Sequence, residues 1–240
     1  RSAFGKPLNA GQTGVAPDYV LVPRERGDGF VSADRDVVQR LYPQLKDNPD
    51  YTAIINERQL APLNGYLQDA QAKGARIVPI YPEAQGRRLP QSLVLDVNDD
   101  MKLMQDEIFG PLLPVVPYER LDDAFPHVNA RPRPLALYYF GYDKREQQRV
   151  LHETHSGGVC LNDTLLHVAQ DDMPFGVVGQ RHVGTDDGRR LAAQFQGHRH
   201  QVVGGGAHHG LADAGGAGEY QVVEGQARER LADVGLAQHD

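Results

Sequence analysis

The chain has 240 residues, enough for one sizeable domain or for one domain with an appendage. Its formal net charge of -7 argues against nucleic acid or an anionic membrane surface as the main partner. No apolar run approaches the roughly 18 residues that span a bilayer, and no stretch has the pattern of a signal peptide. The single cysteine fits a reducing compartment, so we expect a cytoplasmic protein.

Short apolar runs alternate with helical patterns over much of the chain. In chain order the pattern predicts a strand at 19–22, helices at 30–41 and 56–74, strands at 76–80, 92–95 and 112–116, a helix at 121–129, a strand at 135–140, a helix at 143–155 and a strand at 158–161. Asn56 and Asp143 are suited to cap two of the helices, and Gly74 is suited to end one. This alternation predicts a doubly wound, mostly parallel α/β sheet.

The last part of the chain has a different composition. Residues 177–240 contain no Ser, Asn, Lys, Pro, Ile, Met or Cys, and they hold half of the 26 glycines and six of the ten histidines. The joint absence of Ile, Met, Asn and Lys, whose codons begin with adenine, points to a bias in the nucleic acid. We therefore predict a folded domain over 1–176 and a poorly structured Gly-, Ala- and His-rich tail over 177–240, read out of frame or otherwise foreign. A genuine flexible tail is the alternative.

Three short motifs follow one another in the predicted domain. They are Asn9–Gly14 (Asn-Ala-Gly-Gln-Thr-Gly), Glu107–Pro111 (Glu-Ile-Phe-Gly-Pro) and Ser156–Asp163, which Pro174–Gly176 follows. Together and in this order they resemble the aldehyde dehydrogenase superfamily, and the first matches that family's Asn-Ala-Gly-Gln-x-Cys catalytic loop except at its last position. The sequence between the motifs is most similar to the coniferyl aldehyde dehydrogenase branch. The resemblance implies the catalytic domain of that family, which acts on small aldehydes.

The resemblance places Gly14 where the family has its nucleophilic cysteine. In the family a thiolate attacks the aldehyde carbon, the adduct passes hydride to NAD or NADP, and the resulting thioester is hydrolysed. Glycine offers no nucleophile, so we expect this chain not to oxidise aldehydes by that route. The backbone N–H of Gly14 is a remaining donor for an oxyanion. Asn9, in the same loop, is expected to shape the loop rather than to react.

The resemblance also assigns two residues to the cofactor. Glu107 is implied to bind the ribose hydroxyls of the nicotinamide half, and Phe109 to pack near the ring. The alternatives are a solvated carboxylate for Glu107 and a core aromatic for Phe109. The family's dinucleotide-binding half normally precedes the catalytic loop, and this sequence has no Gly-x-Gly-x-x-Gly that opens a helix. We therefore expect weak or absent binding of NAD or NADP.

Other chemistry has weaker support in the sequence. Ser156 follows His155, which makes a serine hydrolase or esterase an alternative, but no Gly-x-Ser-x-Gly elbow exists and a turn role for Ser156 is favoured. Cys160 lies in an apolar strand and is expected to be a small buried hydrophobe, not a replacement nucleophile. Adventitious metal binding is the favoured interpretation of the tail histidines, which are His198, His200, His208 and His209.

A non-catalytic role as a scaffold or partner module is a further alternative. The resemblance implies that the family's first half is missing from this chain, and its absence would leave an apolar face uncovered. Uncovered apolar surface favours association, so we expect the chain to self-associate.

Overall fold

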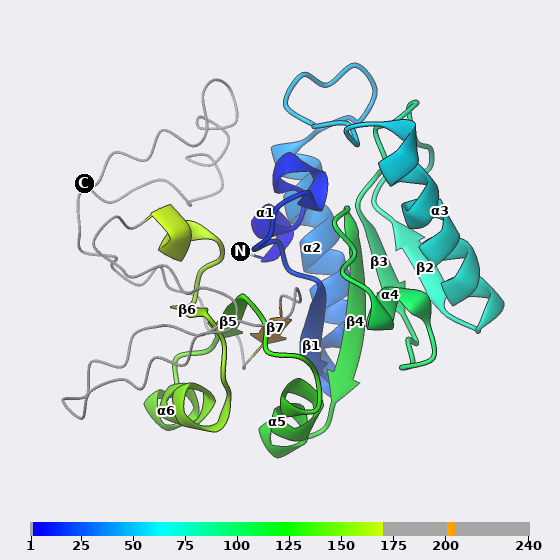
Figure 1. The fold of residues 1–240 in the computed structure, drawn as a ribbon. Helices are drawn as coiled ribbons and strands as arrows, with labels where there is room; N and C mark the ends of the chain where they lie inside the picture. The colour runs from blue at the N-terminus through cyan, green and yellow to red at the C-terminus, as the bar shows by residue number, and fades with distance from the viewer. Residues whose placement is uncertain (1, 170–200, 205–240) are drawn as a thin grey trace.

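The computed structural model describes residues 2–169 and 201–204, which form one seven-stranded sheet with flanking helices (Figure 1). The strand order across the sheet is β2-β3-β4-β1-β7-β5-β6. The strands are β1 (Tyr19–Pro23), β2 (Arg76–Pro79), β3 (Ser92–Leu95), β4 (Leu112–Tyr118), β5 (Ala136–Phe140), β6 (Gly158–Leu161) and β7 (Gln201–Gly204). Every neighbouring pair is parallel except β2 and β3. The mostly parallel α/β fold predicted from the sequence is confirmed.

Side-chain caps mark the start of two of the longer helices, α3 (Glu57–Ala72) and α6 (Lys144–Glu153). The other described helices are α1 (Ser2–Gly5), η1 (Leu8–Gly11), η2 (Arg24–Arg26), α2 (Gly27–Leu41), α4 (Lys102–Gln105), α5 (Leu121–Asn129) and η3 (Leu166–Ala169). The Asn56 carboxamide oxygen accepts from the Gln59 N–H at 2.9 Å and starts α3. Asp143 starts α6 by accepting from the Arg145 N–H at 2.7 Å. Such caps satisfy backbone donors that have no partner inside the helix.

The sheet buries apolar side chains on both faces. On β1, Tyr19 and Leu21 pack in a cluster with residues of α5 and α6, whereas Val20 and Val22 pack in another with residues of α2. This is the alternation that a β-strand imposes on consecutive side chains. Helix α3 covers β3 and β4 through a third cluster that includes Leu63. The helices therefore cover both faces of the sheet, as a doubly wound fold requires (Figure 1).

Most predicted elements are present, and the differences have local causes. Helix α5 and strands β3 and β6 have the predicted bounds, while α2 begins earlier than predicted, at Gly27. Helices α1 and α4 were not predicted, because each is four residues long and too short to show a helical period. In the predicted tail the described residues are Gln201–Gly204, which form β7 in the sheet, a strand that the sequence did not predict. The rest of the tail, with its histidines, lies outside the described residues.

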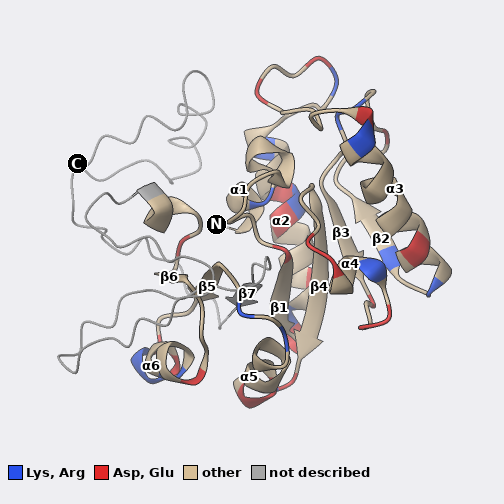
Figure 2. Cartoon of the chain, in the orientation of Figure 1, with Lys and Arg blue, Asp and Glu red and all other residues tan. Residues whose placement is uncertain are grey.

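Charged residues of both signs lie on the helices and loops, while the strands are largely uncharged in this view (Figure 2). Acidic and basic side chains are interspersed, and several form exposed pairs such as Arg149 with Asp122 and Glu153. Within residues 2–169 and 201–204, no helix is both long enough and apolar enough to cross a membrane.

Buried apolar residues of the sheet should dominate stability. Leu112 of β4 is fully buried, whereas the Ile55 side chain is 71% exposed. We expect Leu112→Ala to lower the free energy of unfolding by about 2–5 kcal/mol, because it leaves a cavity. The matched Ile55→Ala change should stay within about 0.5 kcal/mol. Urea unfolding followed by circular dichroism measures both, and equal losses would contradict the described core.

Candidate functional site

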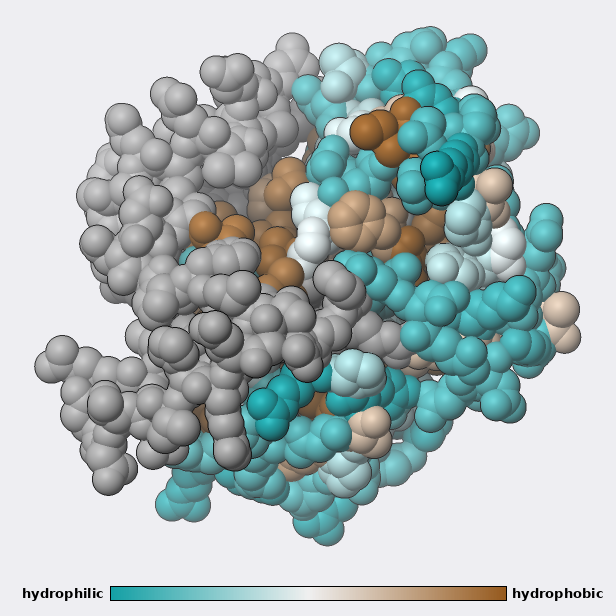
Figure 3. Space-filling view, viewed as in Figure 1, coloured by the Kyte–Doolittle hydropathy of each residue, from teal (hydrophilic) through white to brown (hydrophobic). Residues whose placement is uncertain are grey.

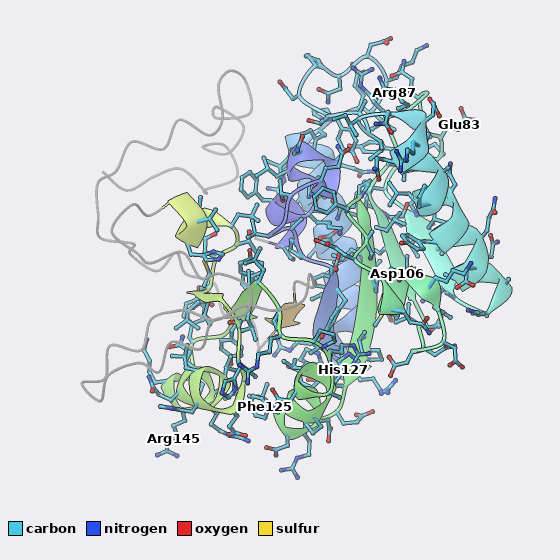
Figure 4. The ribbon with its side chains drawn as sticks, in the orientation of Figure 1. Glu83, Arg87, Asp106, Phe125, His127 and Arg145 are labelled. Carbon is cyan, nitrogen blue, oxygen red and sulfur yellow. The ribbon has the colours of Figure 1, made fainter. Side chains whose placement is uncertain are left out.

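Two of the sequence motifs meet because the strands that follow them are neighbours. The Asn9–Gly14 loop precedes β1, and the Glu107–Pro111 element precedes β4. Since β1 and β4 are adjacent and parallel, their amino ends lie at the same edge of the sheet. Figure 4 labels Asp106, the residue just before the second motif, near α3. The Tyr66 hydroxyl of α3 donates to the Asp106 carboxylate at 3.3 Å, which ties the start of the element to that helix.

The two motifs are in contact through their backbones. Asn9, Ala10 and Gly11 have φ angles of 50°, 53° and 72°, all in the left-handed region that L side chains rarely adopt. A Cβ atom on Gly11 would overlap the carbonyl oxygen of Gly110. A Cβ on Gly110 would in turn overlap the methyl groups of Leu63. Glycine is therefore required at position 11 for the loop to lie against the element, whereas Gly110 leaves room for the Leu63 side chain of α3.

Gln12 fastens the loop to the segment before α3. Its side-chain amide donates to the carbonyl oxygens of Asn9 at 3.0 Å and Ala53 at 3.2 Å, and its Oε1 accepts from the Ile55 N–H at 2.9 Å. The Asn9 carboxamide donates to the Gln12 carbonyl oxygen at 3.2 Å. The side-chain amides of Asn9 and Gln12 thus hold the loop in its shape.

Gly14 lies in an exposed turn just beyond these contacts. Its backbone is not in the left-handed region, and a Cβ atom there would meet only Leu135, at an ordinary 3.6 Å from Cδ2. A larger side chain would fit at this position without moving its neighbours. The structure therefore leaves room for a side chain at position 14, in contrast to position 11.

Glu107 and Phe109 lie in the element that contacts the loop. Phe109 is 46% exposed and has a φ of 50°, so it is not the core aromatic that the sequence left as an alternative. The left-handed backbone holds its ring at the surface at a cost of about 1–2 kcal/mol. Glu107 is partly buried, and its negative charge raises the pKa of the Lys6 ammonium. A carboxylate and an exposed aromatic ring therefore stand two residues apart beside the loop.

Lys6 is a fully buried cation under these two motifs. Its ammonium donates to the carbonyl oxygen of Pro17 at 2.7 Å. Burial lowers the pKa of Lys6 to about 8, while the nearby charges of Asp18 and Glu107 raise it. Asp18, itself buried, accepts from the backbone N–H of Ile108 at 3.2 Å. Lys6 and Asp18 thus link the chain that follows the loop to the Glu107–Pro111 element.

Strand β5 and the residue after the third motif contact the chain on either side of the Asn9–Gly14 loop. The Tyr138 hydroxyl of β5 donates to the carbonyl oxygen of Val15 at 2.7 Å. Thr164 lies so close to Gly5 that a Cβ on this glycine would overlap the threonine side chain. The Asn162 carboxamide accepts from the Gly141 N–H at 2.9 Å, which joins the ends of β5 and β6. Pro174–Gly176, the continuation of this motif, lies outside the described residues.

Cys160 is partly buried and contacts a histidine that the sequence analysis did not single out. Its Sγ lies 3.2 Å from Nδ1 of His167, whose ring meets Tyr138 edge-on at a centroid distance of 5.7 Å. Burial is the largest effect on the thiol and raises the pKa of Cys160 to about 12. A thiol with so high a pKa carries very little thiolate near neutral pH, which agrees with the expectation that Cys160 is not a nucleophile.

The hydrolase and metal alternatives gain no support from the described residues. The Ser156 hydroxyl donates to the carbonyl oxygen of Gly158 at 3.0 Å, as a turn residue would. In the described part of the chain, no group of three or more His, Cys, Asp or Glu residues could hold a metal ion. The tail histidines lie outside it.

Several residues that hold the site were missed from the sequence. Lys6, Asp18 and Tyr138 carry no motif, and their roles arise from contacts with distant segments. A lysine next to a helix pattern reads as a solvated charge unless its burial is known. The sequence feature that could have indicated a role for Lys6 is its position three residues before the Asn9–Gly14 loop.

Comparison with known proteins agrees with this geometry. The sequence matches the model of the Aldehyde dehydrogenase family over residues 1–200. A probable coniferyl aldehyde dehydrogenase of Pseudomonas aeruginosa is 73% identical over 184 residues, which cover 77% of this chain and 39% of that protein. A coniferyl aldehyde dehydrogenase of a Pseudomonas species is 47% identical, over 76% of this chain and 39% of that protein. The chain thus spans about two fifths of the length of these relatives.

Solved structures share the fold as well. A substrate-bound aldehyde dehydrogenase of Staphylococcus aureus has a TM-score of 0.69 and 40% identity, covering 73% of this chain and 38% of that one. An aldehyde dehydrogenase of Mycobacterium tuberculosis complexed with NAD+ has a TM-score of 0.60 and 29% identity, covering 67% of this chain and 35% of that one. The fold is therefore shared with part of these aldehyde dehydrogenases. The chain belongs to the aldehyde dehydrogenase family.

The contact between the two motifs can be tested at Gly11. We expect Gly11→Ala to lower the free energy of unfolding by about 2–5 kcal/mol, from backbone strain and from overlap with Gly110. Gly86→Ala is the matched control, because Gly86 also has a positive φ, of 56°, but open space around its Cβ position. The free energy of unfolding of the control variant should fall only by the cost of backbone strain, about 1–2 kcal/mol. Urea unfolding of both variants measures the difference, and equal losses would mean that the contact with Gly110 is absent.

Buried Lys6 should make stability rise with pH. Burial lowers its pKa from an ordinary 10.5 to about 8 in the folded protein. Between these values the unfolded chain binds a proton that the folded chain has released. The Lys6 contribution to the free energy of unfolding therefore increases from about pH 8 to about pH 10, by up to about 1.4 kcal/mol per pH unit.

The measurement compares urea unfolding of the wild type and Lys6→Met across this range. Other groups titrate in both proteins, including Tyr42 and Tyr81, whose pKa values burial raises to about 12. Their effects cancel in the difference between the two proteins. We expect the wild type to gain stability relative to Lys6→Met as pH rises, and a difference that does not change with pH would refute a titrating buried ammonium.

Proposed function

We propose that this chain derives from enzymes that oxidise aromatic aldehydes to acids with NAD or NADP. We also propose that the chain no longer performs this reaction through a covalent thiol adduct. The observation that carries the proposal is Gly14. It stands at the end of a loop whose other parts, Asn9, Gly11 and Gln12, are all engaged in holding the loop's shape. The aromatic substrate class rests on the names of the Pseudomonas relatives, which are coniferyl aldehyde dehydrogenases.

The chemistry explains why the loss at position 14 matters. The covalent route needs a thiolate to attack the aldehyde carbon, and glycine has no side chain to do so. Removing a nucleophile typically lowers turnover by about 10⁴-fold or more. Cys160 is a poor substitute, because burial raises the pKa of its thiol to about 12. The Gly14 N–H would remain as a single donor to a carbonyl oxygen.

Glu107 and Phe109 are the residues that would hold the nicotinamide half of the cofactor. The partly buried carboxylate suits the ribose hydroxyls, and the exposed ring of Phe109 suits packing against the nicotinamide. Bound NAD or NADP would supply the hydride acceptor. The chain has no Gly-x-Gly-x-x-Gly helix start to bind the pyrophosphate, so we propose weak binding of either cofactor.

The exposed apolar surface supports the proposal that the chain self-associates. Hydrophobic surface shows on one face, next to the residues drawn in grey (Figure 3). Large apolar side chains that are more than a third exposed in the described residues include Ile55, Phe109, Leu161, Leu166 and Val168. Surface of this kind favours association. The cytoplasmic location inferred from the sequence stays a prediction.

An activity assay tests the central proposal. We expect no coniferyl-aldehyde-dependent formation of NADH or NADPH by the wild type above the rate without protein, measured by nicotinamide fluorescence. The full-length Pseudomonas aeruginosa relative serves as the positive control. Aldehyde-dependent turnover by the wild type would contradict this expectation, and its loss in Cys160→Ser would show that a thiol adduct still forms, so the proposal would be wrong.

A second experiment tests whether position 14 is open to a side chain. Cys160→Ser removes the only native thiol, and adding Gly14→Cys places one thiol in the exposed turn. We expect this double variant to react with iodoacetamide at least tenfold faster than the wild type, whose thiol is partly buried. Mass spectrometry of the labelled peptides measures the rates. Labelling no faster than in the wild type would mean that position 14 is covered.

A further inference from the structure

The sheet is joined in its middle by a single short strand. Strands β1 and β5 both pair in parallel with β7, and none of the described pairings joins β1 directly to β5. Figure 1 shows β7 between them. We call the gap between the backbone edges of Tyr19–Leu21 and Leu137–Phe140 the strand slot. Both edges present backbone donors and acceptors, so an occupant pairs on two sides at once.

The residues that border the slot define the chemistry of its occupant. At one level of the sheet Val20 and Tyr138 flank the slot, and at the next level Leu21 and Tyr139 do. All four are at most 1% exposed, and they belong to the clusters on the two opposite faces. A charged side chain at either level would enter an apolar cluster without a partner, which costs several kcal/mol or more. The slot therefore suits an extended, uncharged segment.

The family match ends just before the occupant of the slot. The family match covers residues 1–200 and so includes β1 and β5, whereas β7 begins at Gln201. More than half of the length of the Pseudomonas relatives lies outside their alignment with this chain. Backbone pairing and lack of charge are therefore the features on which we base the choice of occupant.

We propose that the strand slot is a binding site for an extended, uncharged peptide segment that runs parallel to β1 and β5, and that Gln201–Gly204 is its occupant in this chain. Binding is by strand addition, in which main-chain hydrogen bonds supply the affinity. The internal segment Gln201–Gly204 competes with a free peptide for the strand slot, at an effective concentration in the millimolar range. A free peptide therefore binds well only when the internal strand is disabled. This inference needs neither cofactor nor aldehyde and is independent of the proposed function.

The test disables the internal strand in the full chain. Val202→Pro removes a backbone N–H in the middle of β7, and proline is excluded from central strands. The probe is a fluorescein-labelled peptide, Arg-His-Gln-Val-Val-Gly-Gly-Gly, which copies residues 199–206. The chain offers a matched control, because the same Gln-Val-Val recurs at 221–223, so Val222→Pro makes the same change outside β7. Fluorescence anisotropy measures binding.

We expect Val202→Pro to bind the peptide at least tenfold more tightly than the wild type and Val222→Pro. A peptide with Asp in place of both valines should bind at least tenfold more weakly. Amide hydrogen exchange should show protection of 19–23 and 136–140 that is lost in Val202→Pro and restored by the valine peptide. If Val202→Pro does not fold, Val202→Gly keeps the N–H, weakens the strand and gives the same comparison. Equal binding by the Val202 and Val222 variants, or equal binding of the two peptides, would overturn the proposal.

Discussion

The backbone contact between Gly11 and Gly110 determines how the rest of the site is arranged. Parallel pairing of β1 and β4 brings the two preceding segments to one edge of the sheet, and the absence of a Cβ atom on Gly11 lets them touch. Once they touch, the loop that carries Gly14 and the element that carries Glu107 and Phe109 form one surface. The buried Lys6 then holds this arrangement from below, through the carbonyl oxygen of Pro17.

The arrangement depends on segments that are far apart in the chain. Gln12 connects the loop to the residues before α3, and Tyr138 connects the chain after the loop to β5. Each bond satisfies a backbone group that has no partner in a helix or sheet, and such groups are costly to leave unpaired when they are buried. The loop is therefore held on several sides by polar contacts, while the apolar clusters on the two faces hold the sheet beneath it.

Local patterns predicted much of the fold and little of what supports the site. Helices α3 and α6 were predicted because their caps, Asn56 and Asp143, are local signals that the structure uses. Strand β7 could not be predicted, because a valine pair among glycines and histidines has no strand period and its place depends on edges provided by β1 and β5. The site was found through motifs. The burial of Lys6 depends on packing from several elements, so no sequence window contains it.

The open surroundings of Gly14 have a consequence for how such a chain can change over time. Among the described residues only Leu135 would meet a Cβ atom at this position, so the proposed exchange of a thiol for hydrogen would leave neither a cavity nor an unpaired group there. Folding would therefore be insensitive to the proposed exchange, and cellular quality control, which responds to unfolded chains, would not detect it. Gly11 is different, because a Cβ atom there would overlap the backbone of Gly110. The proposed loss of the reactive group is therefore compatible with a folded protein.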